Sequence, residues 1–238
     1  MNLIIIFLVT FLVRIFGIMV GGNRNILLPL LILMGLPANE SLATFKTGGL
    51  SSSLTLIKFH KNGQIKWKIG MYLIPLVTIG TIIGSIIVIN IDQELFKKII
   101  SISVSISLIV FLLRQKIKIR GFKIKNNFLI YVLAVVGGFL GGCIGFRGVF
   151  LRYIYMGSGL NFIEATATAK ITGLLGNIAS VITFVSAGLI NWPIAITMFV
   201  AGGLSSWLGV SLGMKIGNVW LERIFVIVIL AGVIRIFL

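Results

Sequence analysis

The chain has 238 residues, of which 58% are hydrophobic and 11% are charged, and its mean hydropathy is +1.14. These values exclude a soluble globular domain and indicate an integral membrane protein. The formal net charge of +16 does not indicate nucleic-acid binding, because the basic residues mostly fill short gaps between apolar runs, as in cytoplasmic loops. A single cysteine and a single histidine exclude a disulfide within the chain and leave no metal cluster to build, so we expect no metal and no cofactor.

The first half of the chain predicts five helical segments. The apolar run at 3–20 is long enough to span, because about 20 residues at about 1.5 Å each cross a hydrocarbon core of roughly 30 Å. It lacks a basic start and a cleavage site, and Arg14 interrupts it, so we expect a retained span rather than a signal peptide. Glycine-rich residues 21–25 then break the helix, and the next apolar run is only about half a span long. The predicted segments are 3–20, 26–36, 43–59, 67–91 and 95–113.

The second half of the sequence repeats the first, so the chain is a duplication. The aligned residues are Gly21 with Gly145, Gly35 with Gly159, Glu40 with Glu164, Thr44 with Thr168, Lys46 with Lys170 and, after one added residue, Trp67 with Trp192. The second half predicts the segments 128–144, 149–156, 161–187, 192–216 and 219–238. We therefore predict an all-α membrane protein with ten helical segments in two repeats, at 1–120 and 121–238, or eight segments if the short ones are loops.

The loop charges predict that the two repeats have opposite orientations. The lysine-rich loop at 58–68 and the basic cluster at 114–125 should face the cytoplasm, whereas the uncharged loop at 186–191, which corresponds to 58–68, should lie outside. Each inverted repeat would then contain a broken or re-entrant helix pair and three full transmembrane helices, with both chain termini outside the cytoplasmic membrane. Inverted repeats with discontinuous helices are typical of transporters, whose site lies at the repeat interface near the middle of the membrane.

Glycines spaced four residues apart also recur in the predicted spans. By themselves they indicate helix packing, because small residues let backbones approach each other. They occur at Gly80/Gly84, Gly137/Gly141, Gly141/Gly145 and Gly209/Gly213.

Two lysines lie at matching places deep in the two repeats. Lys46 sits about seven residues into its helix, or roughly 10 Å into a core about 30 Å thick, and Lys170 occupies the corresponding place. A cation there costs at least about 2.5 kcal/mol, so each lysine should face a partner or a wet cavity. Snorkelling to the interface is the alternative for each lysine. Pairing with Glu40 or Glu164 on the same helix is disfavoured, because each glutamate lies six residues earlier.

Each helix break is expected to bind an anion. The free N–H groups of the helix that begins there carry about half a positive charge, and neighbouring arginine and asparagine side chains add donors. The expected solute is a small oxyanion. The expected ligands are Lys46, Lys170, Arg24, Arg147, Asn23, Asn25, Gly21, Gly22, Gly145, Gly148, Thr44, Thr168, Ser53 and Asn177, and the candidates for proton coupling are Glu40 and Glu164. Arg24 and Arg147 are alternatively lipid anchors, and we interpret Arg14 and Arg152, which lack repeat partners, as anchors or structural pairs.

The repeated motifs also resemble a known family. They are Glu-x-x-Ala-Thr-x-Lys at 40–46 and 164–170, the glycine-rich breaks and short helices at 21–37 and 145–159, Gly176-Asn177, and Gly-x-Ile-x-Trp at 63–67 and 188–192. Together they resemble the sulfite exporter TauE/SafE family of membrane transporters over nearly the whole chain. The resemblance implies transport of sulfur-containing anions, such as sulfite or organosulfonates, across the cytoplasmic membrane of a prokaryote. Asn23-Arg24-Asn25 and Phe146-Arg147 stand where the family usually has glycines, and the added arginines would suit a more highly charged anion.

Other functional classes are a transporter or channel for another small anion, a membrane assembly protein and a membrane-embedded enzyme. We expect no enzyme, because His60 lies alone in a loop and Cys143 is of a type more common as a small core residue. The expected function is alternating-access transport, with the lipid bilayer and a small anionic solute as partners and without nucleic acid. The direction of transport, the coupling ion and the oligomeric state, including a homo-oligomer, are not readable from the sequence.

Overall fold

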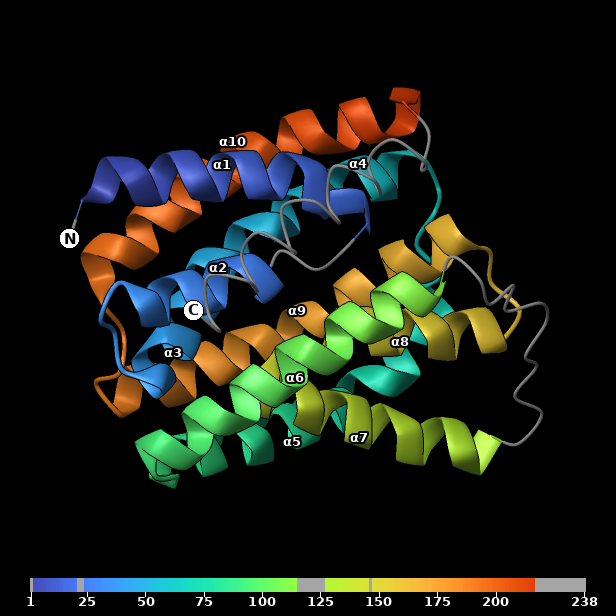
Figure 1. The fold of residues 1–238 in the computed structure, drawn as a ribbon. Helices are drawn as coiled ribbons and strands as arrows, with labels where there is room; N and C mark the ends of the chain where they lie inside the picture. Colours follow the sequence, from blue (N-terminus) through green and yellow to red (C-terminus); the bar gives the residue numbers. More distant parts are fainter. Residues whose placement is uncertain (1, 21–23, 115–126, 146, 217–238) are drawn as a thin grey trace. The chain divides into compact units, whose positions relative to one another are not determined.

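The computed structural model describes residues 2–20, 24–114, 127–145 and 147–216, and its regular structure is helical throughout these ranges. This confirms an all-α protein (Figure 1). Nine of the ten predicted segments are helical in these ranges, and the tenth, at 219–238, lies outside them. The helices are α1 (Leu3–Val20), α2 (Arg24–Leu33), α3 (Ala38–Gly49), the 3-10 helix η1 (Leu50–Leu54), α4 (Thr55–Lys61), α5 (Trp67–Asn90), α6 (Gln93–Arg114), α7 (Asn127–Ile144), α8 (Arg147–Gly157), α9 (Phe162–Ser186) and α10 (Trp192–Ile216).

The helix breaks are shorter than the sequence predicts. Only residues 145–146 separate α7 from α8, because Gly145 has φ +71 and turns the chain in a backbone region that favours glycine. Arg147 therefore lies in the first turn of α8 instead of in a loop before it. In the first half, α2 likewise begins at Arg24. The predicted helix at 43–59 begins earlier, at Ala38, and passes through η1 before α4.

The ends of the short helices are the same in both halves of the sequence. Gly35 follows α2 and Gly159 follows α8, and both have φ +95. The next residue, Leu36 or Leu160, donates its N–H to a carbonyl one turn back in the helix, at 3.2 and 3.1 Å. This left-handed glycine cap satisfies the last helical carbonyls. The sequence duplication is therefore also a duplication of local structure.

The chain divides into two compact units, and each unit takes segments from both halves of the sequence. Unit 1 comprises Met1–Ser52, Asp92–Lys118 and Ile190–Leu238, and unit 2 comprises Ser53–Ile91 and Ile119–Leu189. These units are a different division from the predicted repeats at 1–120 and 121–238. The repeats are defined by sequence similarity, and as domains they stay a prediction.

The two units share one scheme of helix packing. In unit 1, α10 packs on α1 and on α3, and α2 packs on α3. In unit 2, α5 packs on α7 and on α9, and α8 packs on α9 (Figure 1). In the alignment of the two halves, α1 corresponds to α7, α2 to α8, α3 to α9 and α10 to α5. With these correspondences the two packing schemes are the same. In both units the helix that begins with the aligned tryptophan, Trp67 or Trp192, packs on the first helix of the broken pair of the opposite half.

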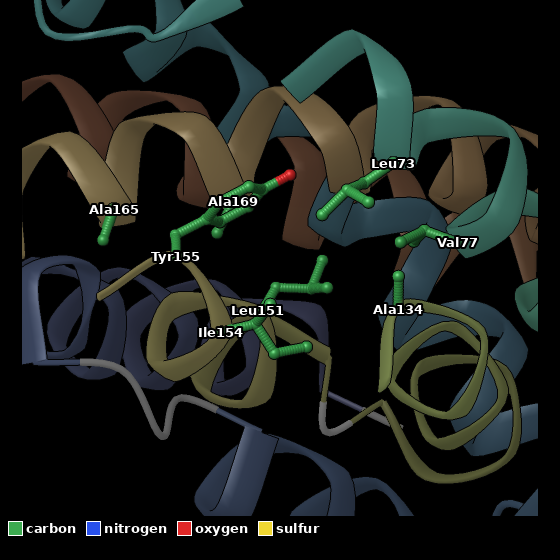
Figure 2. Packing of buried hydrophobic residues seen from close by; sticks show 8 residues of the cluster. All are labelled: Leu73, Val77, Ala134, Leu151, Ile154, Tyr155, Ala165 and Ala169. Carbon is green, nitrogen blue, oxygen red and sulfur yellow. The ribbon is translucent and has the colours of Figure 1, made fainter. Parts of the chain in front are cut away.

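The core of unit 2 fixes the position of α8 (Figure 2). Side chains from α5, α7, α8 and α9 meet in this core: Leu73, Val77, Ala134, Leu151, Ile154, Tyr155, Ala165 and Ala169. Tyr155 is completely buried, and its hydroxyl makes a 2.6 Å hydrogen bond with Thr172, which gives the one polar group in the cluster a partner. Because α8 is held by its apolar face, its first residue has a defined position beside α7 and α9.

Glycines on α5 and α7 bring the two backbones into contact. A Cβ added to Gly80 would lie 2.8 Å from the Phe139 nitrogen, and one added to Gly84 would lie 2.9 Å from the Cys143 nitrogen. On α7 the glycines that face α5 are Gly138 and Gly142. The packing interpretation of Gly80/Gly84 is therefore confirmed. The packing interpretation of Gly137/Gly141 is also confirmed, with a different partner, because these glycines lie against Phe150 and Arg147 of α8.

Several helices have the length and composition of membrane spans. In the part of the chain that the structure describes, three helices qualify: Trp67–Asn90, Phe162–Ser186 and Trp192–Gly209. Leu3–Ile15 and Phe128–Ile144 are shorter and also apolar. Trp67 and Trp192 are exposed at the first residues of α5 and α10, where tryptophan commonly marks the edge of the bilayer.

Candidate functional site

Arg147 is the predicted ligand whose surroundings in unit 2 are best defined. Its side chain lies against α9, where a Cβ added to Gly173 would be 2.8 Å from Nε and one added to Gly176 would be 3.1 Å from Nη1. On α7, a Cβ added to Gly141 would be 2.6 Å from the Cβ of Arg147. Glycines on α9 therefore leave the space that the guanidinium fills, and Gly141 on α7 leaves space for the aliphatic part of the side chain.

The guanidinium of Arg147 lacks a counter-charge in the described part of unit 2. Its Nη1 is buried and has no hydrogen-bond acceptor there, and no described carboxylate forms an ion pair with it. A buried cation without an acceptor is costly, so an acceptor from outside the chain would stabilise this arrangement. This end of the side chain points into the unit, which disfavours the alternative role of Arg147 as a lipid anchor.

Lys170 lies on the same stretch of α9. Its Nζ donates a 2.8 Å hydrogen bond to Thr55 Oγ1 and lies 5.4 Å from the centre of the Phe59 ring. Lys170, Gly173 and Asn177 follow at intervals of three and four residues, so they share one face of the helix. Lys170 and the guanidinium over Gly173 are therefore about one helical turn apart along that face.

Lys46 and Arg14 are buried cations of unit 1. Lys46 on α3 is 4% exposed, and this burial contradicts the alternative in which it snorkels to the membrane interface. Arg14 on α1 is 2% exposed, and its Nη1 donates a 2.7 Å hydrogen bond to Ser51 Oγ. The interpretation of Arg14 as a lipid anchor is therefore wrong. The sequence signal for its burial is its place in the middle of an apolar span.

The aligned threonines make equivalent hydrogen bonds in the two units. Thr168 Oγ1 accepts the backbone N–H of Lys66 at 3.1 Å, and Thr44 Oγ1 accepts the backbone N–H of Asn191 at 3.0 Å. Lys66 and Asn191 directly precede α5 and α10, so each completely buried threonine caps the start of a helix from the opposite half of the sequence. A role of Thr44 and Thr168 in solute binding stays a prediction.

Glu164 has structural partners at the start of α9. It forms a capping box with Asn161, and its carboxylate lies 2.8 Å from Lys66 Nζ. The ion pair is partly exposed, with 42% of the Lys66 side chain and 23% of the Glu164 side chain accessible, so it contributes little to stability. Glu40, its counterpart on α3, is half-buried. Proton coupling at Glu40 or Glu164 stays a prediction.

The remaining predicted ligands are less closely defined. Gly21, Gly22 and Asn23 lie outside the described residues, and so do the side chains of Arg24 and Asn25. Gly148 is exposed, with open space within 4 Å of an added Cβ. Ser53 and Asn177 are half-buried. No group of three or more His, Cys, Asp or Glu residues that could hold a metal ion occurs within the described ranges.

Comparison with known proteins identifies the family. The family profile described as "Sulfite exporter TauE/SafE" matches residues 6–236. A "Probable membrane transporter protein" of Haemophilus influenzae is 26% identical over 231 residues, which cover 94% of this chain and 90% of the relative. The "Probable membrane transporter protein YfcA" of Escherichia coli strain K12 is 24% identical over 235 residues, which cover 94% of this chain and 85% of the relative.

A third relative, the "Probable membrane transporter protein ORF9" of a Sinorhizobium species, is 22% identical over 236 residues, which cover 97% of this chain and 90% of the relative. No solved structure matches the chain significantly. The family profile covers nearly the whole sequence, and all three relatives are named as membrane transporters. The chain therefore belongs to the sulfite exporter TauE/SafE family and is a multi-pass membrane transporter, not an enzyme.

Proposed function

We propose that this transporter carries a small sulfur-containing oxyanion, of the sulfite or organosulfonate type, across the cytoplasmic membrane by alternating access of two inverted repeats. The observation that carries the proposal is the guanidinium of Arg147, which is enclosed by glycines and has a buried Nη1 without an acceptor in the described residues. The family description supports the sulfur-containing class, whereas the printed names of the relatives do not specify a solute.

The chemistry around Arg147 suits an oxyanion. A guanidinium presents parallel N–H donors that match two oxygens of a sulfite or sulfonate group. Arg147 is also the first residue of α8, an 11-residue helix whose free N–H groups add positive potential at the same end. Lys170 contributes a second cation on the same face of α9, and its Nζ is already oriented by the hydrogen bond to Thr55. These groups favour a negative solute with several acceptor atoms.

The matching construction of the two units supports the repeats, and the loop charges support their inversion. Helix packing, the left-handed glycine caps and the threonine caps all occur at aligned positions. Transporters with discontinuous helices in inverted repeats bind their solute near such breaks and expose it alternately to the two sides. Under this proposal the aligned lysines Lys46 and Lys170 are both required for transport.

The test is uptake of labelled sulfite and of a labelled sulfonate into proteoliposomes that contain the full-length protein. We expect saturable flux that is lost in Arg147→Gln, Lys46→Ala and Lys170→Ala. Arg147→Lys should retain part of the flux, because it keeps the charge but loses the planar fork. Lys66→Gln is the matched control. It removes an exposed cation of unit 2 that pairs with Glu164, so flux should stay at the wild-type level.

The same preparation distinguishes the alternatives. Flux that rises linearly with concentration would identify a channel, and absence of flux for every anion would favour an assembly protein. Normal flux in Arg147→Gln and in both lysine variants would contradict the proposed ligands. Thermal stabilisation by sulfite, sulfate, thiosulfate, a sulfonate or a carboxylate ranks the solutes, because a ligand that binds only the folded protein raises its stability.

A further inference from the structure

We propose that an open groove near the beginnings of α5 and α7 binds one anionic phospholipid of the bilayer. The groove has a volume of about 380 Å³ and is lined by Tyr72, Pro75, Leu76 and Tyr131. The inference concerns a component of the membrane and uses none of the residues proposed to bind the solute. Three observations carry it: the depth of the groove, the order of chemical groups along it, and the different residues at the aligned place in unit 1.

The two helices that form the groove begin at the same end of unit 2. Their close contacts advance by four residues on both helices, from Gly80 to Gly84 on α5 and from Phe139 to Cys143 on α7. α5 and α7 therefore run parallel. The sequence before each helix is one of the two basic loops that should face the cytoplasm. The groove is therefore expected in the cytoplasmic leaflet.

The depth of the groove corresponds to a single leaflet. Trp67 is exposed at the first residue of α5, at the expected edge of the bilayer. At about 1.5 Å per residue, Tyr72 lies roughly 7 Å and Leu76 roughly 13 Å further along the helix, within half of a core about 30 Å thick. An open groove at this depth faces hydrocarbon, and an acyl chain that fills it gains contacts that empty space does not provide.

The groups along the groove follow the order of the groups in a phospholipid. Lys68, Tyr72 and Leu76 follow at intervals of four residues, so they share one face of α5. Lys68 is exposed, and Tyr72 and Tyr131 are 74% and 44% exposed. From the edge of the bilayer inward, the protein thus presents an ammonium group, then phenol groups and then an apolar surface. A lipid presents its phosphate, its glycerol esters and its acyl chains in the same order, and a phenol can donate to an ester or phosphate oxygen.

The charge of unit 2 favours an anionic headgroup. The sequence of this unit contains one acidic residue, Glu164, whose carboxylate lies 2.8 Å from Lys66 Nζ. Lys68 forms no ion pair in the described part of the unit. Anionic lipids of the cytoplasmic leaflet attract such lysines. The phosphate of an anionic phospholipid therefore suits the outer end of the groove.

The aligned place in unit 1 lacks these groups. There Pro193 aligns with Lys68, Thr197 with Tyr72, and Phe7 with Tyr131. The hydroxyl of Thr197 donates to the Pro193 carbonyl at 2.8 Å, within its own helix. Since α1 and α10 pack together as α7 and α5 do, helix packing requires neither the lysine nor the two phenols. Their presence in unit 2 indicates a separate role at the end expected to face the cytoplasm.

The experiment measures the affinity of the purified full-length protein in detergent for phosphatidylglycerol and for phosphatidylcholine, by native mass spectrometry. We expect one phosphatidylglycerol to bind more tightly than any phosphatidylcholine. Lys68→Gln should weaken this binding about fivefold, as expected for one lysine at an anionic surface. The double variant Tyr72→Phe with Tyr131→Phe keeps both rings and should weaken it about tenfold, a loss typical of a hydrogen bond to a charged group.

The matched control is Lys97→Gln, which removes the same charge from an exposed lysine of unit 1 and should leave the affinity unchanged. Equal affinity for the two lipids in the wild type would overturn the proposal. An equal loss in Lys97→Gln and Lys68→Gln would also overturn it, because it would show attraction by net charge alone. Dissociation of a dimer by Tyr72→Ala in the absence of phosphatidylglycerol would identify the groove as a contact between two chains and would refute the lipid site.

Discussion

Gly173→Ala is the change that most directly tests the enclosed position of Arg147. An added Cβ would lie 2.8 Å from Nε, whereas ordinary contact begins at 3.4 Å, so the guanidinium must withdraw by about 0.6 Å. Misplacement of a ligand group by about 1 Å commonly costs about a hundredfold in activity, so 0.6 Å should cost about tenfold in anion affinity. Alanine in place of a helical glycine should otherwise stabilise α9 by up to about 1 kcal/mol.

The matched control is the same substitution at the aligned residue of unit 1. In Gly49→Ala the new Cβ would lie 3.7 Å from Arg14 Nη2, an ordinary contact, so anion binding should be unchanged. The assay is the concentration dependence of sulfite flux in proteoliposomes, together with thermal unfolding of each variant in detergent. Equal flux curves for both variants would refute the argument that the glycine at 173 makes room for the guanidinium.

Three further changes test the packing and the caps by thermal unfolding. Thr168→Val should destabilise the protein by about 1–2 kcal/mol, because the N–H of Lys66 loses its buried acceptor, whereas Thr168→Ser should be close to wild type. Gly138→Ala should cost about 1–3 kcal/mol, because the new Cβ would overlap the carbonyl of Val77 across the contact of α5 with α7. Lys66→Gln should change stability less than either of these substitutions, because its ion pair with Glu164 is partly exposed. A larger loss of stability in Lys66→Gln than in Thr168→Val would contradict the expected order of these variants.

The helices could be predicted from the sequence where local chemistry determines them. α10 spans the predicted residues 192–216, and the short helices are each followed by a capping glycine, Gly35 or Gly159, where the backbone is left-handed. The starts of the short helices were less predictable. Arg24 and Arg147 look like loop residues because they are charged, yet each is the first residue of a helix. The N–H groups of a first helical turn have no carbonyl partner within the helix, so a polar surrounding is compatible with this position.

The surroundings of the buried side chains could not be predicted, because they depend on contacts between distant segments. Arg14 is buried through its approach to Gly202, far along the chain, and no local pattern at Arg14 indicates that contact. Thr44 Oγ1 accepts the backbone N–H of Asn191, a contact across 147 positions of sequence that no local pattern at Thr44 indicates. Burial of Lys46, in contrast, follows directly from its depth in an apolar helix.

The way each unit draws on both halves of the sequence has a consequence for biosynthesis. All segments of unit 2 have been translated once residue 189 is reached, whereas α1 of unit 1 must wait for α10, which begins at Trp192. At about 5–20 residues per second, the nascent chain keeps Arg14 without its glycine neighbour for roughly ten to forty seconds. Insertion into the bilayer must therefore tolerate a charged first helix without its packing partner until α10, one of the last helices to be translated, packs on it.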